Sequence, residues 1–184
     1  MNQSIALLGK ITSILAGILL IIAHTLNLLA GHFGSTSGSL LTFLAHLILI
    51  FVFFCLYIYQ GETSGVIGFL AMLLGNIGNI IVTAIVYVEM AEASTEKASF
   101  VFTTAVNEPI HTFGPLLFVI GMILLAVSII RVKVLPTFSG YLLLIGTIVF
   151  AAASVAGDYQ TIIEVMGAVF TGTGLIVAGI KVKS

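Results

Sequence analysis

Residues 40–59 read LLTFLAHLILIFVFFCLYIY, a run that contains no Asp, Glu, Lys or Arg. A helix that crosses a membrane needs about 20 consecutive apolar residues, because the hydrocarbon core is about 30 Å thick and each residue adds 1.5 Å. This segment therefore predicts a transmembrane helix. Its cysteine, Cys55, has no partner for an internal disulfide and is expected to be a small buried hydrophobic residue.

The composition of the whole chain agrees with this segment. Of its 184 residues 60% are hydrophobic and 7% charged, and the mean hydropathy is +1.28. Soluble domains carry about 25% charged residues. We expect an all-α integral membrane protein of the plasma membrane, with residues 1–184 forming one domain in contact with lipid. The net charge of −1 and the lack of a basic run argue against nucleic-acid binding.

Six stretches of the chain are long and apolar enough to cross a bilayer. They cover residues 5–30, 40–59, 65–88, 103–130, 135–157 and 161–181. The pattern predicts a six-transmembrane-helix bundle. The first stretch is too long for the apolar region of a signal peptide, so we expect it to remain as the first helix. Residues 89–102 carry several charges and are expected to form a solvated loop or a short surface helix.

The basic residues predict the orientation of these helices, because Lys and Arg near helix ends stay on the cytoplasmic side. The basic residues that fall on one side of the predicted topology are Lys10, Arg131, Lys133, Lys181 and Lys183. The N- and C-termini should therefore both be cytoplasmic. The opposite side would hold residues 31–39, with a solvated His32, and the acidic segment.

The stretch NEPIHTFGP, residues 107–115, is the first candidate for a functional site. Glu108 and His111 are three residues apart and would project from one face of a helix. Pro115 cannot donate a hydrogen bond to the carbonyl of His111, so the backbone is expected to bend or open there. Ionisable groups in such apolar surroundings are costly and usually functional.

Two further histidines are expected at a similar depth. Counted from the outer helix ends at 1.5 Å per residue, His24 and His46 lie about 10 Å deep and His111 about 6–12 Å deep. Glu164 would lie about 5 Å below the outer end of its helix on the same count. The spacing therefore predicts a layer of histidines and carboxylates in the outer leaflet.

Such a layer could bind a transition metal, because imidazoles and carboxylates are ligands of zinc, copper and iron. The predicted ligands are His24, His46, His111 and Glu108. Groups that would orient these ligands, or replace one of them, are Asn27, Thr112 and Glu164. Haem b held between two of the histidines is a second interpretation. Either cofactor would serve electron transfer, metal handling or sensing.

Three other functions fit the same residues. A small transporter or proton pathway would use Asn76, Asn79 and Thr83 as a polar path. Alternatively, the polar residues and the many glycines serve helix packing, in a homo-oligomer or an accessory subunit of a larger membrane complex. A lipid head-group hydrolase with Ser154 and Asp158 is the weakest interpretation, because the chain has no His-x-x-x-His pair.

Overall fold

The computed structural model describes residues 2–31, 35–94 and 98–183, and these residues form helices and turns without a strand. The α-helices are α1 (Gln3–Leu29), α2 (Thr36–Gln60), α3 (Gly65–Ser94), α4 (Asn107–Val132), α5 (Thr137–Ala153) and α6 (Gln160–Lys181). Short 3-10 helices are η1 (Gly61–Ser64), η2 (Ser99–Thr103) and η3 (Gly157–Tyr159).

Four helical stretches of the described chain are long and apolar enough to cross a membrane. They are Gln3–Leu29, Thr36–Glu92, Asn107–Val132 and Gly157–Lys181. The second of them contains both α2 and α3, which pack against each other. Between these helices Gly61 and Gly65 have φ values of 64° and 54°, which glycine adopts without steric cost. The apolar helix α5 has 17 residues.

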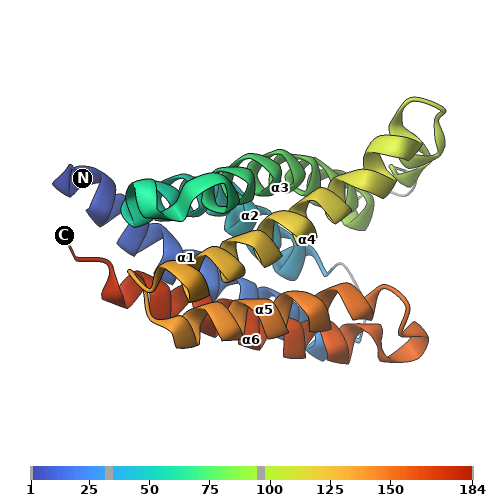
Figure 1. Cartoon of the computed structure of the whole chain (residues 1–184). Coiled ribbons are helices and arrows are strands. Elements are labelled where there is room, and N and C mark those ends of the chain that lie inside the picture. The colour runs from blue at the N-terminus through green and yellow to red at the C-terminus, as the bar shows by residue number, and fades with distance from the viewer. Residues whose placement is uncertain (1, 32–34, 95–97, 184) are drawn as a thin grey trace.

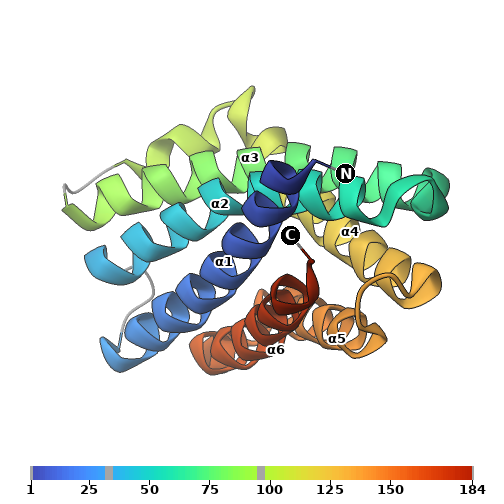
Figure 2. The ribbon, with the colours of Figure 1, turned by 90° about the vertical axis from the view of Figure 1, so that its left-hand side faces the viewer.

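The helices form a closed ring in space. Each helix from α1 to α5 packs against the next one along the chain, and α6 packs back against α1 (Figures 1 and 2). Both termini lie at one end of this ring (Figure 1). Toward the other end, the pair α3–α4 diverges from the pair α5–α6 (Figure 1).

Glycines let the backbones of neighbouring helices touch. A Cβ atom on Gly17 of α1 or on Gly172 of α6 would overlap the backbone carbonyl of the other glycine. A Cβ on Gly121 of α4 would overlap the backbone of Gly75 in α3. Close approach through small residues is typical of membrane helices. The interpretation of these glycines as packing positions is confirmed by these contacts.

The half of the ring nearest the termini, here called the inner half, contains a core of apolar side chains. Large fully buried apolar side chains of the helices include Leu49, Phe53, Leu56, Met122, Leu125, Ile129, Leu143 and Leu175. They come from α2, α4, α5 and α6, so each of these helices contributes to one shared core.

Several predicted boundaries differ from the structure. Helix α3 continues to Ser94, so the first charges of the expected acidic loop lie on a helix, and η2 covers part of the remainder. Helix α4 begins at Asn107 instead of residue 103, and α5 ends at Ala153 instead of residue 157. His32 lies outside the described residues.

Candidate functional site

The half of the ring opposite the termini, the outer half, encloses a cavity of about 310 Å³ lined by residues from all of α1 to α6. Small-molecule pockets in proteins usually measure about 300–1,000 Å³. Most of the wall is apolar. Its polar lining residues are His24, Asn27, Ser39, Thr42, His46, Glu89, Thr147, Ser154, Gln160, Glu164 and Thr171. The cavity can hold a small ligand with an apolar body and a polar head.

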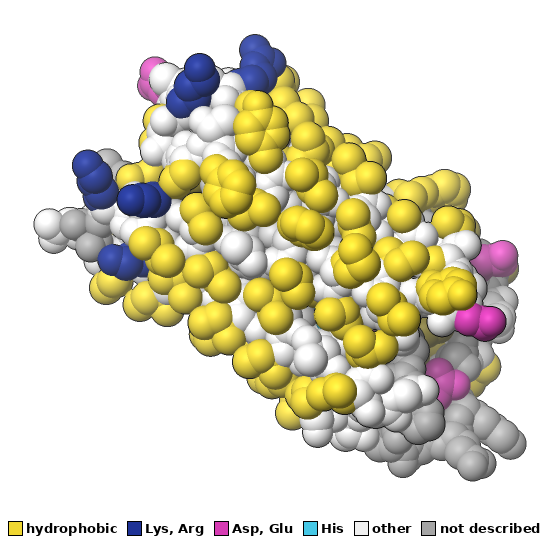
Figure 3. All heavy atoms as spheres, turned by 90° about the horizontal axis from the view of Figure 1, so that it is seen from below, with side chains coloured by type: hydrophobic (Ala, Val, Ile, Leu, Met, Phe, Trp, Pro, Cys, Tyr) yellow, Lys and Arg dark blue, Asp and Glu magenta, His cyan; other side chains and the backbone are white. Residues whose placement is uncertain are grey.

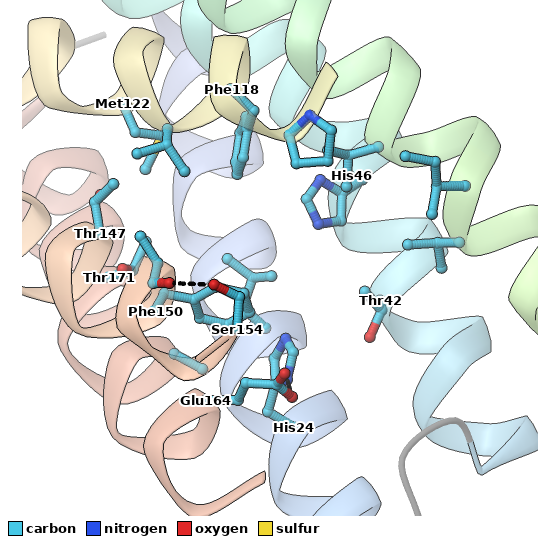
Figure 4. A pocket seen from close by; sticks show the side chains of 18 of the residues that line it. His24, Thr42, His46, Phe118, Met122, Thr147, Phe150, Ser154, Glu164 and Thr171 are labelled. Atoms are coloured by element: carbon cyan, nitrogen blue, oxygen red, sulfur yellow. Dashed lines mark hydrogen bonds and ion pairs between the residues drawn. The ribbon is translucent and has the colours of Figure 1, made fainter. Parts of the chain in front are cut away.

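His24 and Glu164 lie side by side where α1 meets α6 at the cavity (Figure 4). Both side chains are buried, and His24 Nδ1 is 3.7 Å from Glu164 Oε2. Gln160 Nε2 donates a hydrogen bond of 2.9 Å to the other carboxylate oxygen, Oε1. Among the described residues, neither ring nitrogen of His24 has a hydrogen-bond partner. An unpaired buried polar group costs about 1–3 kcal/mol.

His46 projects into the same cavity from α2 and is held by Asn79 of α3. Asn79 is fully buried, its Nδ2 donates to the backbone carbonyl of His46 at 2.7 Å, and its Oδ1 lies 2.7 Å from His46 Nδ1. Because the amide nitrogen faces the carbonyl, the amide oxygen faces the ring, and Nδ1 must carry the hydrogen. A neutral His46 therefore presents Nε2 as a hydrogen-bond acceptor.

Three of the five hydroxyl groups that line the cavity, those of Thr42, Thr147 and Ser154, act as acceptors toward it. Thr42 Oγ1 donates to the carbonyl of Gly38 at 2.9 Å, and Thr147 Oγ1 donates to that of Leu143 at 2.7 Å. Ser154 makes the same kind of bond within its own helix. Since each hydroxyl has one hydrogen, only its lone pairs remain for a ligand.

Two aromatic rings flank the imidazoles. The ring of Phe150 meets His24 edge-on, with centroids 4.9 Å apart, and the ring of Phe118 meets His46 with centroids 5.3 Å apart. Each phenylalanine packs against a glycine of the neighbouring helix, Phe150 on Gly167 and Phe118 on Gly78. Glycine contacts within each helix pair thus position the aromatic walls of the cavity.

The predicted site residues separate into two groups. His24, His46, Asn27 and Glu164 line the cavity, and three of them are within the layer that the depth count predicted. His111 does not line it; its ring lies on that of Phe102, with centroids 4.4 Å apart.

The other predicted residues of α4 also lie outside the cavity, which corrects the expected convergence of α4 with α1 and α2. Glu108 and Thr112 are exposed. Helix α4 reaches the cavity only from Pro115 onward, because Gly114 packs on Ile81 of α3 and the turns before it follow α3 away from α6. Within residues 2–31, 35–94 and 98–183, no group of three or more His, Cys, Asp or Glu side chains is placed to hold a metal ion.

The three residues predicted to form a polar path do not line a common path. Asn79 joins α3 to His46, and Thr83 Oγ1 donates to the carbonyl of Asn79 at 2.7 Å. The Oδ1 atom of Asn76 is buried, and no described residue bonds to it. None of these three residues lines the cavity. Asn79 therefore acts in helix packing, as one of the alternative interpretations expected.

Glu89 and Gln160 line the cavity although the sequence pattern did not select them. Glu89 was assigned to the acidic loop because α3 was expected to end at residue 88. Its spacing from Val82, Ile85 and Val86 places all four on one helix face, and this periodicity was the available signal. Gln160 precedes Glu164 by four residues, which makes the two neighbours on α6.

Comparison of the chain with known proteins found no matching family model, no matching curated protein and no matching solved structure. The functional argument therefore rests on the cavity itself.

Proposed function

We propose that the chain is a membrane protein of six spanning helices with both termini in the cytoplasm. The charge distribution supports this topology, because the Lys and Arg side chains of the described residues gather at the end of the molecule that carries the termini (Figure 3). Exposed acidic groups such as Glu108 and Asp158 belong to the opposite end. A span by α5 is at the short end of the usual range of about 17–25 residues.

We further propose that the outer cavity binds a small amphiphilic molecule. Its apolar body would contact the walls from α3, α4 and α5, and its head would contact His24, His46 and Glu164. The observation that carries the proposal is His24, whose two buried ring nitrogens lack hydrogen-bond partners among the described residues. A ligand would supply them.

Packing alone gives a weaker account of His24. A histidine that only joins helices would bond to a neighbouring helix, as His46 does through Asn79. Buried polar side chains are nearly always paired. His24 is an exception among the described residues, and it lines a cavity. There its ring nitrogens can form hydrogen bonds with a bound ligand.

The filled inner half favours binding over an open channel. Phe53, Met122 and Leu125 are at most 2% exposed and lie on the cytoplasmic side of the cavity. They separate it from the end of the molecule that carries the termini. The proposed protein therefore receives its ligand from the outer leaflet or the outer aqueous phase.

A transition metal or haem in this layer stays a prediction. His24, His46 and Glu164 are ligands of suitable chemistry at the cavity, although the expected third histidine is elsewhere. The test is a visible absorption spectrum of the purified protein, oxidised and reduced, with elemental analysis. A Soret band or stoichiometric metal would replace the amphiphile proposal.

The amphiphile proposal is tested with eight-carbon probes on the protein in lipid nanodiscs. Octanol, octylamine and octanoate are titrated while the midpoint of thermal unfolding is followed. A ligand that binds only the folded state stabilises it by about 2.7 kcal/mol at 100 times its Kd. We expect a saturable rise with at least one probe.

Variants on α6 separate cavity binding from effects on the bilayer. Ala168 lines the cavity and is 1% exposed, so Ala168→Leu and Ala168→Phe should fill it and abolish the rise. The matched control is Val169→Phe, because Val169 is 42% exposed on the adjoining face. No saturable rise with any probe, or an equal rise in the filled variants, would contradict the proposal.

A further inference from the structure

We propose that the head group recognised in the outer cavity is a hydrogen-bonding cation, the ammonium of a lipophilic amine. This inference rests on the proposed function, since it names the class of ligand for the same cavity. It follows from the sign of the charges and the direction of the hydrogen bonds that the lining offers.

The carboxylates of the cavity lie on different helices. Glu164 of α6 has one oxygen bonded to Gln160, while its other oxygen is 3.7 Å from His24, which is beyond hydrogen-bond distance. Glu89 lines the cavity from α3 and lies within electrostatic reach of Glu164. A cation placed in the cavity would be attracted by both carboxylates and would reduce their mutual repulsion.

Several uncharged polar groups of the lining also favour a cation, because they offer hydrogen-bond acceptors. A neutral His46 presents Nε2 as an acceptor because Nδ1 donates to Asn79, and the hydroxyls of Thr42 and Thr147 have donated their hydrogens to backbone carbonyls. A primary ammonium carries three donors and no acceptor. It therefore complements the acceptors that His46, Thr42 and Thr147 present to the cavity.

An anionic head would find no Lys or Arg among the described residues that line the cavity. The Lys and Arg side chains of the described residues gather at the opposite end of the molecule (Figure 3). A carboxylate or phosphate would approach Glu89 and Glu164 with only the histidines as cationic groups. In a low-dielectric site, unpaired like charges are strongly unfavourable.

His24 can also bind the ligand directly, because its buried ring nitrogens have no hydrogen-bond partner among the described residues. Its ring lies between Glu164 and the edge of Phe150 (Figure 4). A bound amine can donate to a neutral His24 and a charged Glu164 together.

The test compares octylamine, octanol and octanoate, which share one chain and differ only in the head group. At neutral pH octylamine is an ammonium. Binding is measured at equal free concentration in nanodiscs by the shift of the unfolding midpoint. We expect octylamine to bind about tenfold more tightly than octanol, as charge-assisted hydrogen bonds predict, and octanoate more weakly than octanol.

The matched variants are Glu164→Gln and Glu108→Gln. Glu164→Gln should weaken octylamine binding about tenfold and leave octanol binding nearly unchanged, because only the charged contact is lost. Glu108 is exposed and does not line the cavity, so Glu108→Gln should change neither. Glu89→Gln gives a second cavity variant if Glu164→Gln fails to fold.

The two proposals fail differently. If octanol or octanoate binds as tightly as octylamine, the cation inference is overturned and the amphiphile cavity stands. If octylamine binds best but Glu164→Gln and Glu89→Gln both leave its affinity unchanged, the assigned recognition is overturned. If no probe binds saturably, the proposed function itself is overturned.

Discussion

The inner and outer halves of the ring use the same six helices in opposite ways. In the inner half, Phe53, Ile129 and Leu175 are buried in one apolar core between the helices. In the outer half the helix pairs diverge, and His24 and Glu164 face a cavity. Lipid is as apolar as these side chains, so packing rather than burial from water holds membrane helices together. Stability should therefore depend on the inner half, and ligand specificity on the outer half.

Phe53→Ala should have the largest effect on stability. Phe53 is 0% exposed and contacts Gly75 of α3, so its removal leaves a hole among tightly packed neighbours. We expect a loss of about 3–5 kcal/mol in the free energy of unfolding. A reversible unfolding titration measures it, and a loss below that of Phe150→Ala would break the comparison between the halves.

Gly121→Leu should be the next most damaging change. Any side chain at Gly121 would overlap the backbone of Gly75. Relief of this overlap would push α3 and α4 apart. Overpacking of this kind costs about 1–3 kcal/mol. The control is Ile120→Leu at a position 45% exposed. Thermal unfolding of both variants tests the prediction, and equal midpoints would show that the glycine contact is unimportant.

Asn79→Leu should destabilise the protein by about 1–2 kcal/mol, because two hydrogen bonds between α2 and α3 are lost. Asn76→Leu is the contrasting variant. The Oδ1 atom of Asn76 is buried and unpaired among the described residues, so this change should be neutral or stabilising. Thermal unfolding of the pair checks the contrast, which disappears if both variants behave alike.

Phe150→Ala should destabilise the protein less than Phe53→Ala, because Phe150 is only half-buried and its side chain already borders the cavity. The same change should enlarge the outer cavity and favour a longer probe. Titration with decanol against octanol measures this preference. An unchanged preference would show that Phe150 does not limit the length of the ligand.

Hydropathy could predict the apolar helices but only part of the candidate site. Residues 40–59 lie within α2 because a long apolar run has few alternatives. Depth counting depends only on the helical rise, and it predicted one layer for His24 and His46, which both line the cavity. It failed for His111 because depth does not specify the direction in which a side chain points. That direction follows from the contact of Gly114 with Ile81, a tertiary contact that no local pattern contains.

Glu89 was misplaced in the opposite sense to His111: it was expected outside the site and lines the cavity. Its charge was taken as the end of a transmembrane helix, whereas α3 continues past it and places the carboxylate in the cavity. A carboxylate within the membrane is costly, so the sequence pattern assigned Glu89 to a solvated loop. The cavity that makes this position acceptable is formed by helices distant in the sequence. The segment around Glu96 and Lys97 lies outside the described residues.

The central claim is that the outer half is hollow and accessible while the inner half is closed, and α2 carries a probe position in each. Cys55 is the chain's one cysteine and is 1% exposed in the inner half; Thr42 lines the cavity. The measurement is labelling by a membrane-impermeant, positively charged thiol reagent added outside intact cells, in the natural chain and in Thr42→Cys. We predict no labelling of the natural chain, and labelling of Thr42→Cys that octylamine prevents. Labelling at Cys55, or none in Thr42→Cys, would contradict the account.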